Sequence, residues 1–176
     1  GMIPMPTPRF TKLENAVIST IVGQMLSRQS ASTIYKRIES LAHNNNFESL
    51  MELTDRDLRT AGLSERKVKT IRSFQIYKEK RSSDFLNWKN MSYYDLEQSI
   101  KGEIYGFSDW SISMIAIYHF NHLDIFPYAD GTLKRSLEKL KNQLNISGGL
   151  DVSKARPFST YFALFLWRVT DEKLFN

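Results

Sequence analysis

The sequence contains no cysteine among its 176 residues. This absence excludes disulfide bonds, a thiolate nucleophile, cysteine-ligated zinc and a cysteine-held iron–sulfur cluster. Histidine is also scarce, because the chain has only His43, His119 and His122, and none of them pairs with carboxylates at a spacing typical of metal ligands. We therefore expect no metal site.

Long apolar runs are absent as well. The most apolar stretch, residues 161–169, is nine residues long, whereas a membrane-spanning helix needs roughly 20. We expect this stretch to form a buried helix. No basic segment followed by a hydrophobic one begins the chain, so secretion is not indicated. We expect a cytoplasmic protein with no membrane partner, and we interpret Gly1, which precedes Met2, as a residue left by expression cloning.

Positive charge is concentrated in one segment. The whole chain carries a net charge of +5, but residues 59–81 hold eight basic and two acidic residues, so this segment is +6 and the remainder about −1. Such a cluster is either an ordinary solvated helix face or the footprint of a protein that binds phosphates. Arg66, Lys67 and Lys69 are its candidate phosphate contacts.

Apolar residues recur at helical spacing along most of the chain. Residues 17–25 and 31–42 each carry one apolar stripe, and few segments alternate with the period of a strand. The residues that can begin helices are Thr54 with Asp57, Ser64, Ser92, Ser108 and Asp130, and Pro157 suits the first turn of the closing helix. Residues 43–46 read as a polar loop, and Gly62 as a helix end. The sequence predicts a single all-α domain over residues 13–172, preceded by a tail, residues 1–12.

Residues 101–118 combine a helix end, a turn and a helix start. Gly106 supplies the turn and Ser108 can begin the next helix. A turn of this kind between two short helices presents backbone N–H groups and the positive end of a helix dipole to a DNA phosphate. The contact positions a protein on DNA without reading the sequence.

The order of these features resembles the helix-hairpin-helix (HhH-GPD) DNA glycosylase superfamily, and is closest to its alkylated-base (3-methyladenine) branch. In that family the hairpin is followed by an aspartate at a helix start, which Asp130 matches. Residues 16–41 resemble the family's early helix pair, residues 57–74 its Gly-Leu turn before a basic helix, and residues 155–167 the closing helix of the alkylated-base branch. The resemblance covers residues 13–169 and implies a compact helical domain with a catalytic aspartate at a helix start.

Positions 108 and 110 depart from the usual family pattern. The hairpin reads Gly106-Phe107-Ser108 where Gly-apolar-Gly is usual, and serine adopts unusual backbone angles less freely than glycine. Trp110 stands where bifunctional members carry a nucleophilic lysine. Without that amine, the resemblance implies no Schiff-base chemistry and no strand cleavage.

The resemblance also implies roles for the site residues. Asp130 would stabilise the oxocarbenium-like sugar left by the departing base and orient the incoming water, while it can also cap its helix. Trp110 and Trp167, with Tyr128 and Tyr161 nearby in the sequence, would hold the flipped base by stacking.

Gln24 and Met25 occupy the position of a Gln-Gln pair in many relatives. Met25 ends the first apolar stripe, so it either packs in the core or fills the gap that a flipped base leaves in the stack. The expected DNA contacts are Gln24, Met25, Gly106, Phe107, Ser108, Arg66, Lys67 and Lys69.

These expectations describe a monofunctional DNA glycosylase of base-excision repair. It would act as a monomer on duplex DNA containing a damaged base, an alkylated purine, in the cytoplasm at the nucleoid, with no cofactor beyond water. Two alternatives stay open. The first is a non-catalytic helix-hairpin-helix module that recognises distorted duplex, and the second is an all-α adaptor with a protein partner. A steep salt dependence of binding would separate DNA binding from the second.

Overall fold

The computed structural model describes residues 4–172, and over this range the chain is helical with no β-strand. Its elements are α1 (Leu13–Gly23), α2 (Arg28–Asn44), η1 (Leu50–Glu52), α3 (Asp55–Ala61), α4 (Glu65–Lys80), α5 (Ser82–Asn87), η2 (Trp88–Asn90), α6 (Tyr93–Ile100), α7 (Asp109–Tyr118), α8 (Gly131–Gln143), η3 (Val152–Ala155) and α9 (Ser159–Asp171). The predicted all-α fold is confirmed. None of the helices within residues 4–172 is long and apolar enough to cross a membrane.

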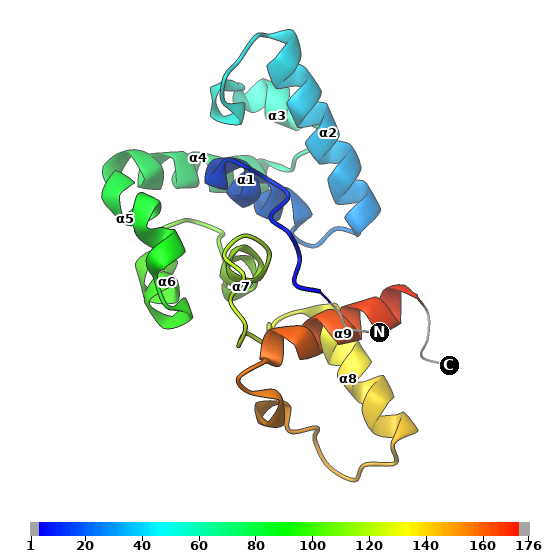
Figure 1. The fold of residues 1–176 in the computed structure, drawn as a ribbon. Helices are drawn as coiled ribbons and strands as arrows, with labels where there is room; N and C mark the ends of the chain where they lie inside the picture. Colours follow the sequence, from blue (N-terminus) through cyan, green and yellow to red (C-terminus); the bar gives the residue numbers. More distant parts are fainter. Residues whose placement is uncertain (1–3, 173–176) are drawn as a thin grey trace.

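The helices are arranged around α1, which contacts α2, α4 and α7 (Figure 1). α3 packs on α2 at one end of the molecule, and α8 packs on α9 at the other. α6 packs on α7 to form the hairpin pair. Residues 24–27 join α1 to α2, and residues 119–130 join α7 to α8.

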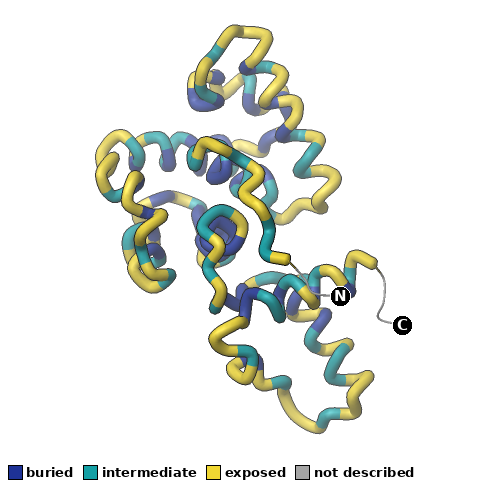
Figure 2. Tube along the Cα trace, in the orientation of Figure 1, coloured by how far each residue is buried: buried dark blue, intermediate teal, exposed yellow. Residues whose placement is uncertain are grey.

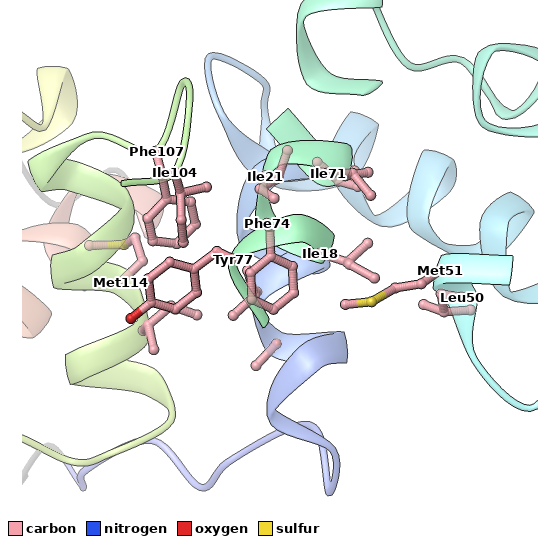
Figure 3. Close-up of a cluster of buried hydrophobic side chains, with 14 of the residues drawn as sticks. Ile18, Ile21, Leu50, Met51, Ile71, Phe74, Tyr77, Ile104, Phe107 and Met114 are labelled. Carbon is pink, nitrogen blue, oxygen red and sulfur yellow. The ribbon is translucent and has the colours of Figure 1, made fainter. Parts of the chain in front are cut away.

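Two hydrophobic cores follow from this arrangement, because buried residues line the inner faces of the helices (Figure 2). In the larger core, Phe74 and Tyr77 of α4 lie between Ile18 of α1 and the hairpin residues Ile104 and Phe107 (Figure 3). The smaller core belongs to α8, α9 and their neighbours, and its buried members are Phe126, Leu133, Val152, Ala163 and Leu166. Trp167 packs against both cores, so it joins the α8–α9 pair to the rest of the protein.

Side-chain caps set most of the helix starts. Thr54 and Asp57 form the predicted capping box, with Asp57 Oδ2 accepting from Thr54 N–H at 2.9 Å. The hydroxyl oxygen of Ser64 accepts from the N–H of Lys67 at 3.4 Å, and Ser92 caps α6 in the same way. Each cap satisfies an amide that the first helical turn leaves without a partner, as the sequence pattern predicted.

Several predicted boundaries are shifted. α2 continues to Asn44, so the polar loop begins later than residue 43. α9 begins at Ser159, so Pro157 precedes the helix rather than occupying its first turn. Ser108 is the N-cap residue of α7 but makes no side-chain capping bond.

The N-terminal segment, predicted as a tail, contacts the helical domain. Within its described part, the Phe10 ring lies 5.2 Å from that of Tyr35 and packs against the larger core.

Candidate active site

Asp130 receives three hydrogen bonds from three parts of the chain. As N-cap of α8, its Oδ1 accepts from the N–H of Leu133 at 2.9 Å. The indole N–H of Trp167, in α9, donates to the same oxygen at 3.2 Å. The indole N–H of Trp110, in α7, donates to Oδ2 at 2.8 Å. A carboxylate has about four acceptor positions, so a position remains for a further donor such as water.

Asp130 lies in the wall of a cleft of about 640 Å³. The cleft is lined by Gly23, Gln24, Met25, Leu26, Ser64, Arg66, Lys67, Gly106, Ser108, Trp110, Ala129, Asp130, Gly131, Thr132 and Arg135. Three of these side chains are basic and one is acidic. A single carboxylate within a cationic rim suits a polyanion whose sugar becomes positively charged during reaction.

The predicted hairpin turn forms one edge of this cleft. Gly106 has φ of +72°, the left-handed region that favours glycine. Phe107 is buried in the larger core and anchors the turn. Ser108 has φ of −91° and ψ of 169°, extended backbone that any residue adopts. The replacement of the usual second glycine by Ser108 therefore brings no backbone strain.

Gly106 is required by close packing as well as by its φ. A Cβ added here would collide with Oγ1 of the buried Thr70, and that hydroxyl is held by donation to the Arg66 carbonyl at 3.0 Å. Thr70 belongs to α4, so the glycine lets the hairpin turn lie directly against this helix.

We expect Gly106→Ala to lower the free energy of unfolding by about 2–4 kcal/mol, because it adds left-handed strain and a core collision. Gly102→Ala is the matched control: its φ is +81°, but a Cβ there meets nothing within 4 Å. Chemical denaturation of both variants separates strain from collision. Equal losses for the two variants would refute the collision, whereas rescue of Gly106→Ala by Thr70→Ala would support it.

Gln24 and Met25 lie in a tight turn between α1 and α2. The N–H of Leu26 donates to the Gly23 carbonyl at 3.2 Å, which closes the turn. Gln24 has φ of −52° and ψ of 126°, and Met25 has φ of +56°, the pattern of a type II turn. α1 ends at Gly23, so Met25 does not continue the apolar stripe of that helix, and its side chain is fully exposed at the cleft.

The basic segment divides into structural and cleft-facing residues. Arg72 pairs with Asp55 at 2.7 Å, and Lys78 pairs with Glu14 at 2.5 Å, so both tie helices together. Arg66, on the first turn of α4, is exposed and lines the cleft.

Lys67 and Lys69, unlike Arg66, each contact another residue of the protein. Nζ of Lys67 donates to the Val22 carbonyl at 2.7 Å, and burial lowers the pKa of this lysine. Lys69 is exposed and lies 3.7 Å from Glu65.

The family of the chain follows from a comparison with known proteins. Residues 18–152 match the family described as the HhH-GPD superfamily of base excision DNA repair proteins. The chain belongs to this superfamily. Among described residues, 4–172, no group of three or more His, Asp or Glu side chains is placed to hold a metal ion.

Two relatives of the HhH-GPD chain carry names that specify an activity. DNA-3-methyladenine glycosylase 1 of Schizosaccharomyces pombe is 26% identical over 165 residues, which cover 88% of this chain and 71% of the relative. A solved structure of DNA-3-methyladenine glycosidase from Bacillus halodurans superimposes with a TM-score of 0.74 at 26% identity, covering 95% of this chain and 78% of that one.

A third comparison shows the fold. The S. pombe 3-methyladenine DNA glycosylase in complex with abasic DNA has a TM-score of 0.74 and 18% identity, covering 96% of this chain and 85% of that one.

The structure brings together some residues of the predicted base pocket and not others. Trp110 and Trp167 both reach Asp130, as described above. Tyr128 is exposed, with its ring 5.0 Å from Phe126. The ring centroid of Tyr161 lies 6.3 Å from that of Phe158. Neither tyrosine is part of the cleft wall that holds Asp130, and Trp167 is not part of it either, although its indole N–H reaches the carboxylate.

Two other residues near the site of this HhH-GPD protein were not predicted from the sequence. The ring of Tyr118, in α7, lies 6.1 Å from that of Trp167, and burial raises the pKa of Tyr118 to about 12. Arg135 lines the cleft one turn into α8, and only the basic character of that helix pointed to it.

Proposed function

We propose that this HhH-GPD protein is a monofunctional DNA glycosylase that removes alkylated purines from duplex DNA in base-excision repair. The observation that carries the proposal is the carboxylate of Asp130, held by two indole N–H groups in a cationic cleft beside the hairpin turn. The names of the two relatives, both 3-methyladenine glycosylases, support the alkylated purine as the substrate class.

The reaction breaks the bond between C1′ of the sugar and the base nitrogen. Its electron pair leaves with the base, so positive charge develops on the sugar, and the oxygen of water then attacks C1′. Asp130 stabilises that charge and can take the proton released by the water. Trp110, which lines the cleft, provides aromatic surface beside the carboxylate for an extruded base, and Trp167 holds the other carboxylate oxygen. An alkylated cationic base gains a cation–π contribution. Trp110 has no amine, so the product is an abasic site without strand cleavage.

DNA binding is assigned to the rim of the cleft. The turn Gly106-Phe107-Ser108 would bind a phosphate through the backbone N–H groups of Gly106, Ser108 and the start of α7, since the N–H of Phe107 already donates to the Ile104 carbonyl at 3.2 Å. Met25, exposed and unbranched, suits the gap left by the flipped base. Gln24 lies beside it in the cleft wall.

The basic residues of α4 would add electrostatic attraction to this grip. Arg66 and Lys67 lie in the cleft wall, and Lys69 extends the charge along the helix. The active species we propose is a monomer bound to duplex DNA, in the cytoplasm at the nucleoid.

Arg66→Ala is expected to weaken duplex binding equally for unrelated sequences. Loss of one phosphate contact should reduce the slope of log affinity against log salt by about 1. Fluorescence anisotropy titrations at several salt concentrations measure this slope. Lys89→Ala, which removes one positive charge from an exposed position in η2, is the control. A slope unchanged from wild type would remove Arg66 from the phosphate contacts.

A single-turnover assay tests the function directly. Duplexes carrying a methylated purine, hypoxanthine or uracil are incubated with excess protein, with and without alkali. Strand breaks that appear only after alkali, and foremost with the methylated purine, are the expected result. Breaks without alkali would mean a lyase. Tight binding to distorted duplex without any product would favour the non-catalytic module.

A further inference from the structure

The backbone at Met25 is unusual for the side chain that it carries. Position three of a type II turn favours glycine because φ is positive there, yet a methionine occupies it with φ of +56°. The Met25 side chain gains no compensating burial, since it is fully exposed. A residue held in a sparsely populated conformation persists only when its surroundings fix it, so contacts of the neighbouring residues must hold this turn.

Gln24 supplies those contacts. Its Nε2 donates to the carbonyl of Gly106 at 3.0 Å and to Oγ of Ser111 at 2.9 Å, so both N–H groups of the amide are used within the protein. Gly106 is the turn residue of the hairpin, and Ser111 is a fully buried residue of α7. A single side chain thus bonds the Met25 turn to the proposed phosphate-binding turn.

The start of the Met25 turn is held independently. Nζ of Lys67 donates to the carbonyl of Val22, in the last turn of α1, at 2.7 Å. The turn is therefore held from α4 on one side and from the hairpin on the other. Lys67 fixes where α1 ends, whereas Gln24 fixes the residue directly before Met25.

We propose that Gln24 is a positioning residue that locks Met25 to the DNA-binding hairpin, so that the two act as one rigid unit. We call Met25 the wedge, because it is the side chain proposed to fill the gap left by the flipped base. The inference rests on the proposed function for the roles of wedge and hairpin. Its consequence is that docking of a phosphate at Gly106 sets how deeply Met25 enters the base stack. Without the hydrogen bonds of Gln24, the hairpin still binds the DNA backbone, but the Met25 side chain is no longer held at the correct position relative to the base stack.

Gln24→Glu tests the lock, because a carboxylate oxygen would face the Gly106 carbonyl in place of an N–H donor. At saturating enzyme, we expect excision from a fully paired duplex to slow by about tenfold or more. A lesion opposite a mismatched base is easier to flip out of the duplex, so its excision should slow no more than about threefold. Ser111→Ala, which removes one acceptor without a change of charge, should show the same pattern with a smaller loss.

The matched control is Gln143→Glu, an identical substitution at the exposed end of α8. It should leave both rates at the wild-type value. Equal slowing of Gln24→Glu on paired and mismatched substrates would overturn the proposal, because a general structural role affects both alike.

A double-mutant cycle with Met25→Ala decides whether Gln24 acts through the wedge. In the Met25→Ala background, Gln24→Glu should cause less than a further twofold loss on the paired duplex, because there is no wedge left to position. Full additivity of the two losses would overturn the proposal.

A fluorescence measurement on bound DNA tests the position of Met25 without depending on catalysis. 2-Aminopurine opposite an abasic site changes fluorescence when a side chain enters the stack beside it. Wild type and Gln143→Glu should change the signal, while Gln24→Glu should bind the same DNA without changing it. If wild type excises no base but gives the signal and Gln24→Glu does not, the proposed function fails and the lock stands. If Gln24→Glu gives the wild-type signal, the lock is refuted. If wild type binds without the signal, the lock is refuted.

Discussion

Replacing Asp130 with asparagine is expected to reduce base excision by at least about a hundredfold, the scale of losing one preorganised electrostatic contact in an active site, and to leave binding to abasic DNA intact. The neutral amide cannot stabilise the positive sugar, and it cannot take a proton from water. The fold should survive, because asparagine is as good an N-cap as aspartate. Its oxygen can still accept from the N–H of Leu133, the bond that starts α8.

The geometry makes one further loss unavoidable in Asp130→Asn. Both carboxylate oxygens accept from N–H donors, Oδ1 from Leu133 and Trp167, and Oδ2 from Trp110. An asparagine that keeps its oxygen toward Leu133 turns its NH2 toward the indole N–H of Trp110, where two donors face each other.

Single-turnover rates and anisotropy with abasic-site duplex measure the two consequences of Asp130→Asn. The control is Asp124→Asn, which neutralises a carboxylate bound to Ser159 and Arg156 outside the cleft wall. Excision within a few-fold of wild type would exclude Asp130 from catalysis, and loss of abasic-DNA binding would assign it a structural role instead.

Local signals in the sequence accounted for most of the helix starts. Thr54, Ser64, Ser92 and Asp130 cap helices as predicted, because a cap depends only on residues up to three positions away. The shifted starts are those without such a signal. α9 begins after Phe158, which makes no side-chain capping bond, so Pro157 was the only nearby marker and misplaced the start.

Contacts between distant segments could not be predicted in the same way. Trp110 and Trp167 lie 20 and 37 positions from Asp130, and only the packing of α7, α8 and α9 brings their N–H groups to it. Tyr128 is two positions from Asp130 in the sequence and yet lies outside the cleft wall. The family resemblance names both tryptophans, whereas Tyr128 and Tyr161 were added for their proximity in the sequence, which does not say whether a side chain reaches the carboxylate.

The apolar pattern around Met25 is compatible with two structures, a longer first helix or a turn. Apolar spacing extended the first helix to Met25, whereas Gly23 ends it and the chain turns. The turn has no Asn or Gly at its left-handed position to reveal it, since a methionine stands there. Only the bonds made by Gln24 and Lys67, from partners far along the chain, show why this turn forms.

Trp110→Phe is expected to slow excision by roughly 10- to 100-fold, because a hydrogen bond to a charged group contributes about 1.5–3 kcal/mol. Phenylalanine retains an aromatic face for the base but has no N–H. Oδ2 of Asp130 then loses the 2.8 Å bond, the one donor from residues 4–172 that this oxygen has. Trp167→Phe should cost less, because Oδ1 keeps the N–H of Leu133 when the 3.2 Å indole bond is lost.

The order of these losses separates two roles of the tryptophans. Trp110→Ala removes both the N–H and the aromatic face, so it should weaken binding of the base as well as slow the chemical step. Single-turnover rates measured across enzyme concentrations resolve the two effects. If Trp110→Phe matches wild type while Trp110→Ala is inactive, the ring stacks on the base and its N–H is dispensable. If Trp110→Phe is slow at saturation with unchanged half-saturation, the indole N–H acts by holding the carboxylate where positive charge develops.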